Sequence, residues 1–140
     1  MKNLTPILLF GGLYLFFRSN DSSVEDAANR AIRDAQNAGE QPTYSDVQFT
    51  AIASTIHESL RFSVFADNKA QAERALLLMN KDIDVYKLIK TYGKRWHHMF
   101  GVPDGPAKDL PQAISGELSE SRKANINRNY QLKGMTFRWV

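Results

Sequence analysis

The most apolar stretch of the chain lies near its N-terminal end, and the residues after it are much more polar. Residues 4–17 read LTPILLFGGLYLFF, fourteen residues without a charge between Lys2 and Arg18. A helix of this length is about 21 Å long, whereas the hydrocarbon core of a bilayer is about 30 Å thick. Snorkelling of the two flanking cations and local thinning of the bilayer can make up the difference, so the pattern favours a single-pass membrane anchor at residues 1–18. Its apolar side chains are Leu4, Ile7, Leu8, Leu9, Phe10, Leu13, Tyr14, Leu15, Phe16 and Phe17.

Two other interpretations of this stretch stay open. A run of this length is also typical of the hydrophobic region of a cleaved signal peptide. The run ends Phe16-Phe17-Arg18, which is a poor match to the small residues of a cleavage site. The stretch could instead be a buried or oligomerisation segment, but Pro6 and Gly11-Gly12 favour a membrane helix over a soluble one. Cations on both sides leave the orientation in the membrane undecided.

Residues 19–43 predict a hinge and a linker helix. Ser22 and Glu25 have the spacing of a capping box, and Gly39 is a natural residue after a helix end, so the helix should run from about Val24 to Gly39. Its apolar side consists mostly of alanine, which predicts weak packing and a stalk-like role. That side contains Val24, Ala28, Ala31, Ile32 and Ala35.

A helix with strong start signals opens the domain predicted at residues 44–140. Ser45 and Gln48 form a capping box, and Tyr44 and Phe49 occupy the positions of a hydrophobic staple. The helix should end near Arg61. Its apolar residues recur with helical spacing, which predicts one wide buried face. They are Phe49, Ile52, Ala53, Ile56 and Leu60.

Cap residues also predict the next two helices. Asp67 or Asn68 should cap a helix that Asn80 closes, and Asp82 should cap another that ends near Gly93. Residues 97–108 contain two glycines and two prolines, which predicts the longest loop of the domain. The apolar faces of the two helices are Ala72, Ala75, Leu76 and Met79 for the first, and Val85, Leu88, Ile89, Tyr92 and Trp96 for the second.

The last part of the chain predicts two helices and an extended tail. Asp109 and Gln112 form a capping box for a short helix, and Ser119 should cap a final helix that runs to Gly134. The tail, MTFRWV, should be extended, with its aromatic side chains against the bundle. No earlier segment alternates like a strand, so the sequence predicts an all-α domain of five helices. Its expected core includes Phe49, Ile52, Ile56, Leu76, Met79, Val85, Ile89, Tyr92, Ile114 and Leu118.

Length, cysteine content and charge narrow the class of protein. A chain of 140 residues supports one domain, and without cysteine it has no disulfides and no thiolate metal sites. Residues 19–80 contain nine acidic and five basic residues, whereas residues 81–140 contain eleven basic and six acidic ones. The basic half could bind phosphates or an acidic partner, although solvated helix surfaces are the favoured interpretation. Its candidate basic interaction face is Lys90, Lys94, Arg95, Arg122, Lys123 and Arg128.

Three segments of the domain resemble an annexin repeat, which has five helices. The end of the third repeat helix is similar to residues 85–95, VYKLIKTYGKR. The fourth repeat helix is similar to residues 109–121, DLPQAISGELSES, and the fifth to residues 121–135, SRKANINRNYQLKGM. The resemblance covers roughly residues 47–138. A single repeat behind a short hydrophobic segment resembles small membrane-associated structural proteins of bacteria and of membrane-containing bacteriophages. The resemblance implies a virion internal membrane or a bacterial cell membrane as the location, with the bilayer and coat or envelope proteins as partners; self-association stays open.

The chain departs from annexins where they bind calcium. Annexin calcium sites need a Gly-x-Gly-Thr turn between the first two helices, and the corresponding residues here, 62–67, contain no glycine. Asp104 and Asp109 lie at about the right distance along the chain to supply the remote acidic ligand. Without the turn they are better interpreted as a loop residue and a helix cap. We therefore expect no calcium and no other cofactor.

Three other features suggest chemistry less strongly. Glu58, followed by Ser59, is similar to the Glu-Ser pair of lytic transglycosylases, but the Gly-Leu-Met-Gln element of those enzymes is missing. His97 and His98 are adjacent and cannot easily ligate one metal ion. The aromatic residues Trp96, Tyr92, Tyr130 and Trp139 interleave with Arg95, Arg122 and Arg128 in a way that could bind single strands, but helical spacing favours a core role.

The favoured hypothesis is a non-enzymatic, membrane-anchored structural protein that links a membrane to a protein layer. The most concrete case is a minor membrane protein of a membrane-containing bacteriophage virion. Two alternatives from other classes are a cell-envelope lytic enzyme that uses Glu58 and a membrane-tethered nucleic-acid-binding protein. Neither nucleic acid nor calcium is the expected partner.

Overall fold

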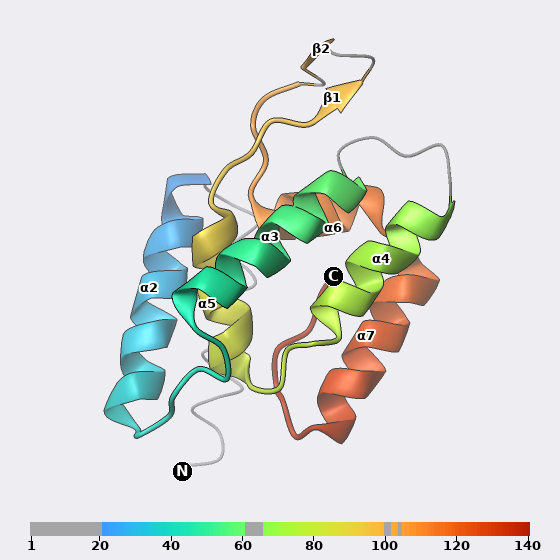
Figure 1. Ribbon diagram of the computed structural model, residues 1–140. Helices are drawn as coiled ribbons and strands as arrows, with labels where there is room; N and C mark the ends of the chain where they lie inside the picture. Colours follow the sequence, from blue (N-terminus) through green and yellow to red (C-terminus); the bar gives the residue numbers. More distant parts are fainter. Residues whose placement is uncertain (1–20, 61–65, 100–101, 104) are drawn as a thin grey trace.

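The computed structural model describes residues 21–60, 66–99, 102–103 and 105–140, and these residues form six helices and one small hairpin (Figure 1). The predicted anchor at residues 1–18 lies outside this part of the chain. Among the described residues, none of the helices is long and apolar enough to cross a membrane. The helices are α2 (Asp21–Asn37), α3 (Asp46–Leu60), α4 (Ala66–Leu76), α5 (Asp82–Tyr92), α6 (Leu110–Glu117) and α7 (Glu120–Leu132), and the strands are β1 (His98–Met99) and β2 (Val102–Pro103).

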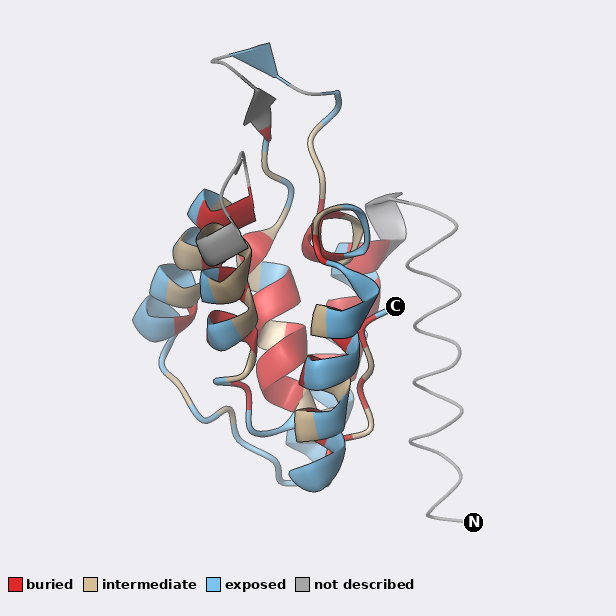
Figure 2. Cartoon of the chain, turned by 90° about the vertical axis from the view of Figure 1, so that its right-hand side faces the viewer, coloured by how far each residue is buried: buried red, intermediate tan, exposed pale blue. Residues whose placement is uncertain are grey.

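The helices surround α5. Helices α2 and α3 both pack against α5, α4 packs against α3, and α7 lies against α4 on the opposite side of the bundle from α2 (Figure 1). Buried residues gather in the middle of the bundle, and the outward faces of the surrounding helices are exposed (Figure 2). The prediction of an all-α chain with five helices after Ser45 is confirmed for the described residues. Nine of the ten predicted core residues are buried, and Ile52 is half-buried against the same core.

Helix α2 is more firmly packed than its sequence suggested. Val24, Ala27, Ala28, Ala31 and Ile32 are all buried and belong to the same apolar cluster as the rest of the bundle. The alanine-rich face predicted weak packing because alanine buries little apolar area. Small side chains also let two helix backbones approach closely, and α2 and α5 pack in this way. Helix α2 is therefore part of the packed domain.

The predicted caps of three helices are confirmed. The Ser45 N–H donates to Gln48 Oε1 (2.9 Å) and the Gln48 N–H to Ser45 Oγ (3.3 Å), and the Tyr44 and Phe49 rings meet edge to face at 5.8 Å. Asp109 and Gln112 cap α6 reciprocally, and Ser119 caps α7 through the Arg122 N–H.

Two boundaries of α4 differ from the prediction. The helix begins at Ala66, so Asp67 and Asn68 lie inside it, and it ends at Leu76 instead of at Asn80. The following residues form tighter turns, in which the Leu78 N–H donates to the Ala75 carbonyl and the Met79 N–H to the Leu76 carbonyl. Three-residue turns of this kind commonly close a helix and satisfy its last carbonyls.

The prediction that Asp82 caps α5 is wrong. Lys81 is the N-cap residue, and the carboxylate that closes the helix start is that of the buried Asp84. Its Oδ2 accepts from the backbone N–H groups of Asn80 (3.0 Å) and Lys81 (3.2 Å). Asp84 also accepts from the Thr43 N–H and the Thr43 hydroxyl, both at 2.7 Å. Asp84 thus joins the α2–α3 connection to the start of α5.

The C-terminal tail packs on the bundle as predicted. Asp82 accepts hydrogen bonds from the N–H groups of Thr136 (3.0 Å) and Phe137 (2.9 Å), so its carboxylate holds the tail. Trp139 is buried: its backbone exchanges two hydrogen bonds of 2.8 Å with the Asn127 side chain, and its indole N–H donates to the Tyr130 hydroxyl at 3.3 Å.

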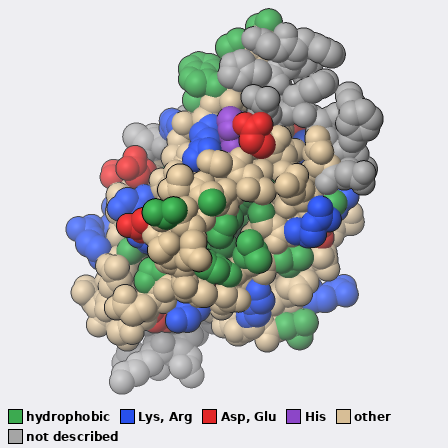
Figure 3. All heavy atoms as spheres, in the orientation of Figure 1, with side chains coloured by type: hydrophobic (Ala, Val, Ile, Leu, Met, Phe, Trp, Pro, Cys, Tyr) green, Lys and Arg blue, Asp and Glu red, His purple; other side chains and the backbone are tan. Residues whose placement is uncertain are grey.

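The segment predicted as one long loop contains a short antiparallel hairpin. Strands β1 and β2 pair in the register His98 with Pro103, and below them Arg95 and Lys108 exchange two backbone hydrogen bonds of 2.9 Å. Val102 of this hairpin is exposed, and hydrophobic side chains are visible at the top of Figure 3, where Figure 1 places the hairpin. Paired strands of two residues are too short to give an alternating sequence pattern.

Candidate functional site

The six residues of the predicted basic interaction face come from two segments of the fold. Lys90, Lys94 and Arg95 lie in or just after α5, whereas Arg122, Lys123 and Arg128 lie on α7. Arg122 forms an ion pair with Glu73, and the buried Lys123 forms one with Glu120 (2.6 Å). The Arg95 guanidinium lies over the Tyr92 ring, 4.9 Å from its centroid. On the face shown in Figure 3, Lys and Arg side chains are spread around the periphery.

The aromatic residues considered for nucleic-acid binding are mostly in the core. Tyr92, Tyr130 and Trp139 are buried, and Trp96 is about half exposed. Stacking on a base requires an accessible ring face. Three of the four rings therefore cannot serve as a stacking platform at the surface.

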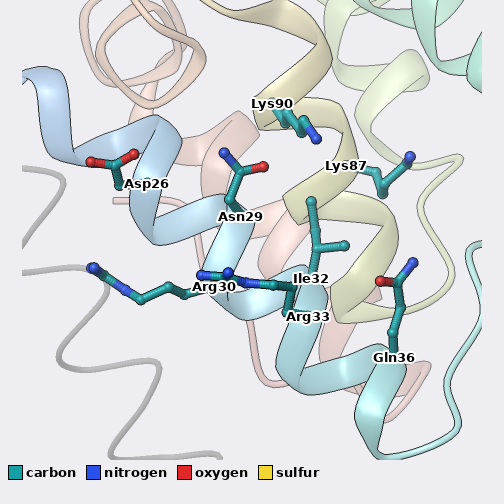
Figure 4. Close-up of a pocket in the computed structure, with 8 residues that line it drawn as sticks. All are labelled: Asp26, Asn29, Arg30, Ile32, Arg33, Gln36, Lys87 and Lys90. Atoms are coloured by element: carbon teal, nitrogen blue, oxygen red, sulfur yellow. The ribbon is translucent and has the colours of Figure 1, made fainter.

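A groove between α2 and α5 brings together cations from the two halves of the sequence (Figure 4). It has a volume of about 550 Å³, and we call it the α2–α5 groove. Arg30 and Arg33 come from α2, and Lys87 and Lys90 come from α5. Asp26 supplies the one carboxylate of the lining. The complete lining is Asp26, Asn29, Arg30, Ile32, Arg33, Gln36, Lys87 and Lys90.

The packing of α2 on α5 creates this groove. Ile32 is buried between the two helices, and the polar side chains line the groove from both of them (Figure 4). Residues three apart are neighbours on a helix surface, so the two arginines of α2 lie side by side, as do the two lysines of α5. The Lys87 ammonium is also held by the Asp46 carboxylate at 2.8 Å, and this contact lowers the pKa of Asp46.

The cations and amides that line the α2–α5 groove are suited to bind an oxyanion. Arginine presents several N–H donors in a fixed fork that matches phosphate or carboxylate oxygens, and lysine adds positive charge. The Asn29 and Gln36 amides can donate further hydrogen bonds. Of the four cations, the sequence prediction included Lys90 but missed Arg30, Arg33 and Lys87. The three-residue spacing within each pair was visible in the sequence, but the contact between α2 and α5 was not.

Two histidines and a tyrosine form a second polar cluster at the base of the hairpin. The His57 and His97 ring centroids are 5.3 Å apart, and His97 Nε2 lies 3.1 Å from the Tyr92 hydroxyl. His57 Nε2 lies 2.9 Å from the Trp96 carbonyl oxygen, so this nitrogen carries the proton that it donates. Among the described residues, no group of three or more His, Asp or Glu side chains could hold a metal ion. Asp104 and the His98 side chain lie outside the described part, and Asp109 caps α6.

His97 should make the fold less stable in mild acid. Burial lowers the pKa of His97 below its ordinary value of 6.5, and the nearby His57 and Lys108 lower it further. Glu117 and the Leu60 carbonyl act in the opposite direction, but their effect is smaller. The unfolded chain therefore binds more protons than the folded chain as the pH falls below 6.5, and the free energy of unfolding decreases until folded His97 is itself protonated.

Chemical denaturation over a pH series checks this expectation. The wild type should lose stability between neutral pH and the pKa of folded His97, and the variant His97→Gln should lose less over the same interval. Equal pH dependence in the two proteins would contradict the assignment of this effect to His97.

Glu58, the candidate catalytic acid of the lytic alternative, is exposed on α3. A general acid of this type usually lies in an apolar cleft that raises its pKa. We expect no Glu58-dependent clearing of a peptidoglycan suspension. Clearing by the wild type that is absent from Glu58→Gln, with both proteins folded, would establish the lytic activity instead.

Comparison of the chain with protein-family models, with curated proteins and with solved structures found no match. The function proposed below therefore depends on the residues and the geometry of this chain.

Proposed function

We propose that the chain is a non-enzymatic, membrane-anchored structural protein that links a membrane to a protein layer. The observation that carries the proposal is the uncharged stretch of residues 4–17 between Lys2 and Arg18, directly before a folded helical domain. The resemblance to single-repeat annexin-like proteins makes a minor membrane protein of a membrane-containing bacteriophage virion the most concrete case.

The packing of α2 supports a domain held close to the membrane. Helix α2 begins at Asp21, three residues after Arg18, and it is part of the core of the domain. Three residues span at most about 11 Å even when fully extended. The packed domain therefore starts within a short reach of the proposed anchor, which suits a connector better than a domain on a long tether.

The arrangement of charge supports contact with two different surfaces. The α2–α5 groove is lined by α2 and α5. Helix α2 lies on one side of the bundle, and α4 and α7 lie on the opposite side (Figure 1). Helices α4 and α7 expose both Arg74 and Arg128 as well as Glu120. A surface of mixed charge can select a partner of complementary charge. In this proposal the α2 side faces the membrane and the α4–α7 side faces the protein layer.

The annexin-like arrangement of residues 44–140 is part of the same proposal. Its support is the order of five helices, α3 to α7, with the longest connection between the third and the fourth. Of residues 62–67, which correspond to the calcium turn of an annexin, 62–65 lie outside the described residues. The structural role proposed here needs no calcium.

Purification of the assembly that contains this protein tests the proposal. The chain should copurify with membrane and with a coat-forming protein, should resist extraction by high salt, and should be released by detergent. Salt does not weaken burial of an apolar segment, whereas it screens surface charge contacts. Release by salt alone, or recovery with membrane but with no protein layer, would contradict the proposal.

A further inference from the structure

The α2–α5 groove has features of a binding site that the structural role alone does not explain. Arg33 and Lys90 are exposed at the groove and come from different helices, and Lys87 lies nearby, its side chain about one-fifth exposed. Cations from two helices around one groove cost electrostatic energy unless anions neutralise them. Asp26 and Asp46 supply part of that neutralisation, since Asp46 holds Lys87, and a bound anion could supply more.

We propose that the α2–α5 groove binds the phosphate groups of anionic lipid headgroups. This inference rests on the proposed membrane anchor, because the anchor places α2 beside the bilayer. Arg33 lies twelve residues into α2 from Asp21, about 18 Å along the helix. Helix α2 would therefore lie along the membrane surface with the groove facing the headgroups.

The lining of the groove favours a lipid headgroup over a nucleic acid. None of its residues is aromatic, and binding of single strands uses aromatic rings for stacking. The groove is open to the surface, which suits the phosphates of a flat layer. The Asp26 carboxylate can accept a hydrogen bond from a headgroup hydroxyl, so phosphatidylglycerol offers groups that match both the cations and the acid.

A fluorescent label at the groove can test this in the full-length chain. The protein has no cysteine, so Gln36→Cys gives one labelling position at the groove, and Ser121→Cys on α7 gives an exposed control position on the other side of the bundle. The labelled chains are reconstituted in vesicles of phosphatidylcholine, with or without phosphatidylglycerol. Quenching by acrylamide, which is uncharged, then reports how accessible each label is to water.

Phosphatidylglycerol should roughly halve the quenching of the label at residue 36 and leave the label at residue 121 unchanged, because the anionic surface attracts the basic groove. The double change Arg33→Gln and Lys90→Gln should abolish this protection. The matched double change Arg74→Gln and Arg128→Gln removes two exposed cations outside the groove and should preserve it. Circular dichroism confirms that all variants are folded.

Other outcomes overturn the inference in distinguishable ways. A chain that fails to associate with either type of vesicle would contradict the proposed anchor. A chain that associates with both, but whose residue-36 label is equally accessible in both, would contradict the groove inference alone. Protection by inorganic phosphate in phosphatidylcholine vesicles would assign the groove to a free anion, and loss of protection in the Arg74 and Arg128 variant would assign the effect to net charge.

Discussion

The change Asp84→Ala is expected to lower the free energy of unfolding by about 3 kcal/mol, because it removes a charged acceptor that serves several donors at once. The buried Asp84 carboxylate accepts from the Thr43 N–H and hydroxyl and from the Asn80 and Lys81 N–H groups. These bonds hold the α2–α3 connection against the first turn of α5. Their loss leaves N–H donors at the start of α5 without a protein partner, and it also frees the α2–α3 connection at Thr43 from α5.

Urea denaturation of the wild type, Asp84→Ala and Asp84→Asn measures this effect. The asparagine variant keeps the shape and one acceptor oxygen, so its loss should be smaller. Asp34→Ala removes an exposed carboxylate on α2 and should change stability by less than about 0.5 kcal/mol. An Asp84→Ala protein as stable as Asp34→Ala would show that the network contributes little.

The change Trp139→Ala should lower the free energy of unfolding by about 3–5 kcal/mol, the range for removal of a large buried aromatic side chain. The Trp139 ring packs against Phe137 with centroids 4.8 Å apart, and its indole N–H donates to the Tyr130 hydroxyl. That hydroxyl in turn donates to the Leu76 carbonyl at 2.7 Å. Loss of the indole therefore opens a cavity between the tail, α7 and the end of α4.

The neighbouring residue provides the control for this prediction. Val140 is about half exposed, and Val140→Ala should change stability by less than about 0.5 kcal/mol. Thermal and urea unfolding of the two variants should differ clearly. Equal stability would mean that the tail packs loosely and that the domain does not depend on it.

The most accurate predictions from the sequence concern features that depend on residues close to one another along the chain. The Ser45–Gln48 and Asp109–Gln112 boxes were visible because the paired residues are three positions apart, and the structure confirms both. Asp82 carried the same kind of signal, but its carboxylate bonds to Thr136, 54 residues away. A local rule cannot anticipate such a partner.

Contacts between elements explain the other differences. Alanine gives a weak hydrophobic signal, yet Ala28 is fully buried because its size allows α2 to approach α5 closely. The α2–α5 groove depends on this contact, so its two arginines and two lysines could not be assigned to one site from their order in the chain. The six residues of the predicted basic face likewise come from two separate segments, α5 with the residues just after it and α7, and their order in the chain does not show how these segments lie.

Flotation of the full-length chain with phosphatidylcholine vesicles in a density gradient tests the proposed anchor most directly. The wild type should float with the vesicles at low and at high salt, because apolar burial is not screened by ions. The double change Leu9→Lys and Leu13→Lys should leave the chain at the bottom, since each lysine near the centre of a membrane helix costs about 2.5–3.5 kcal/mol. A wild-type chain that stays soluble and monomeric without detergent, and does not float, would contradict the anchor and the structural role built on it.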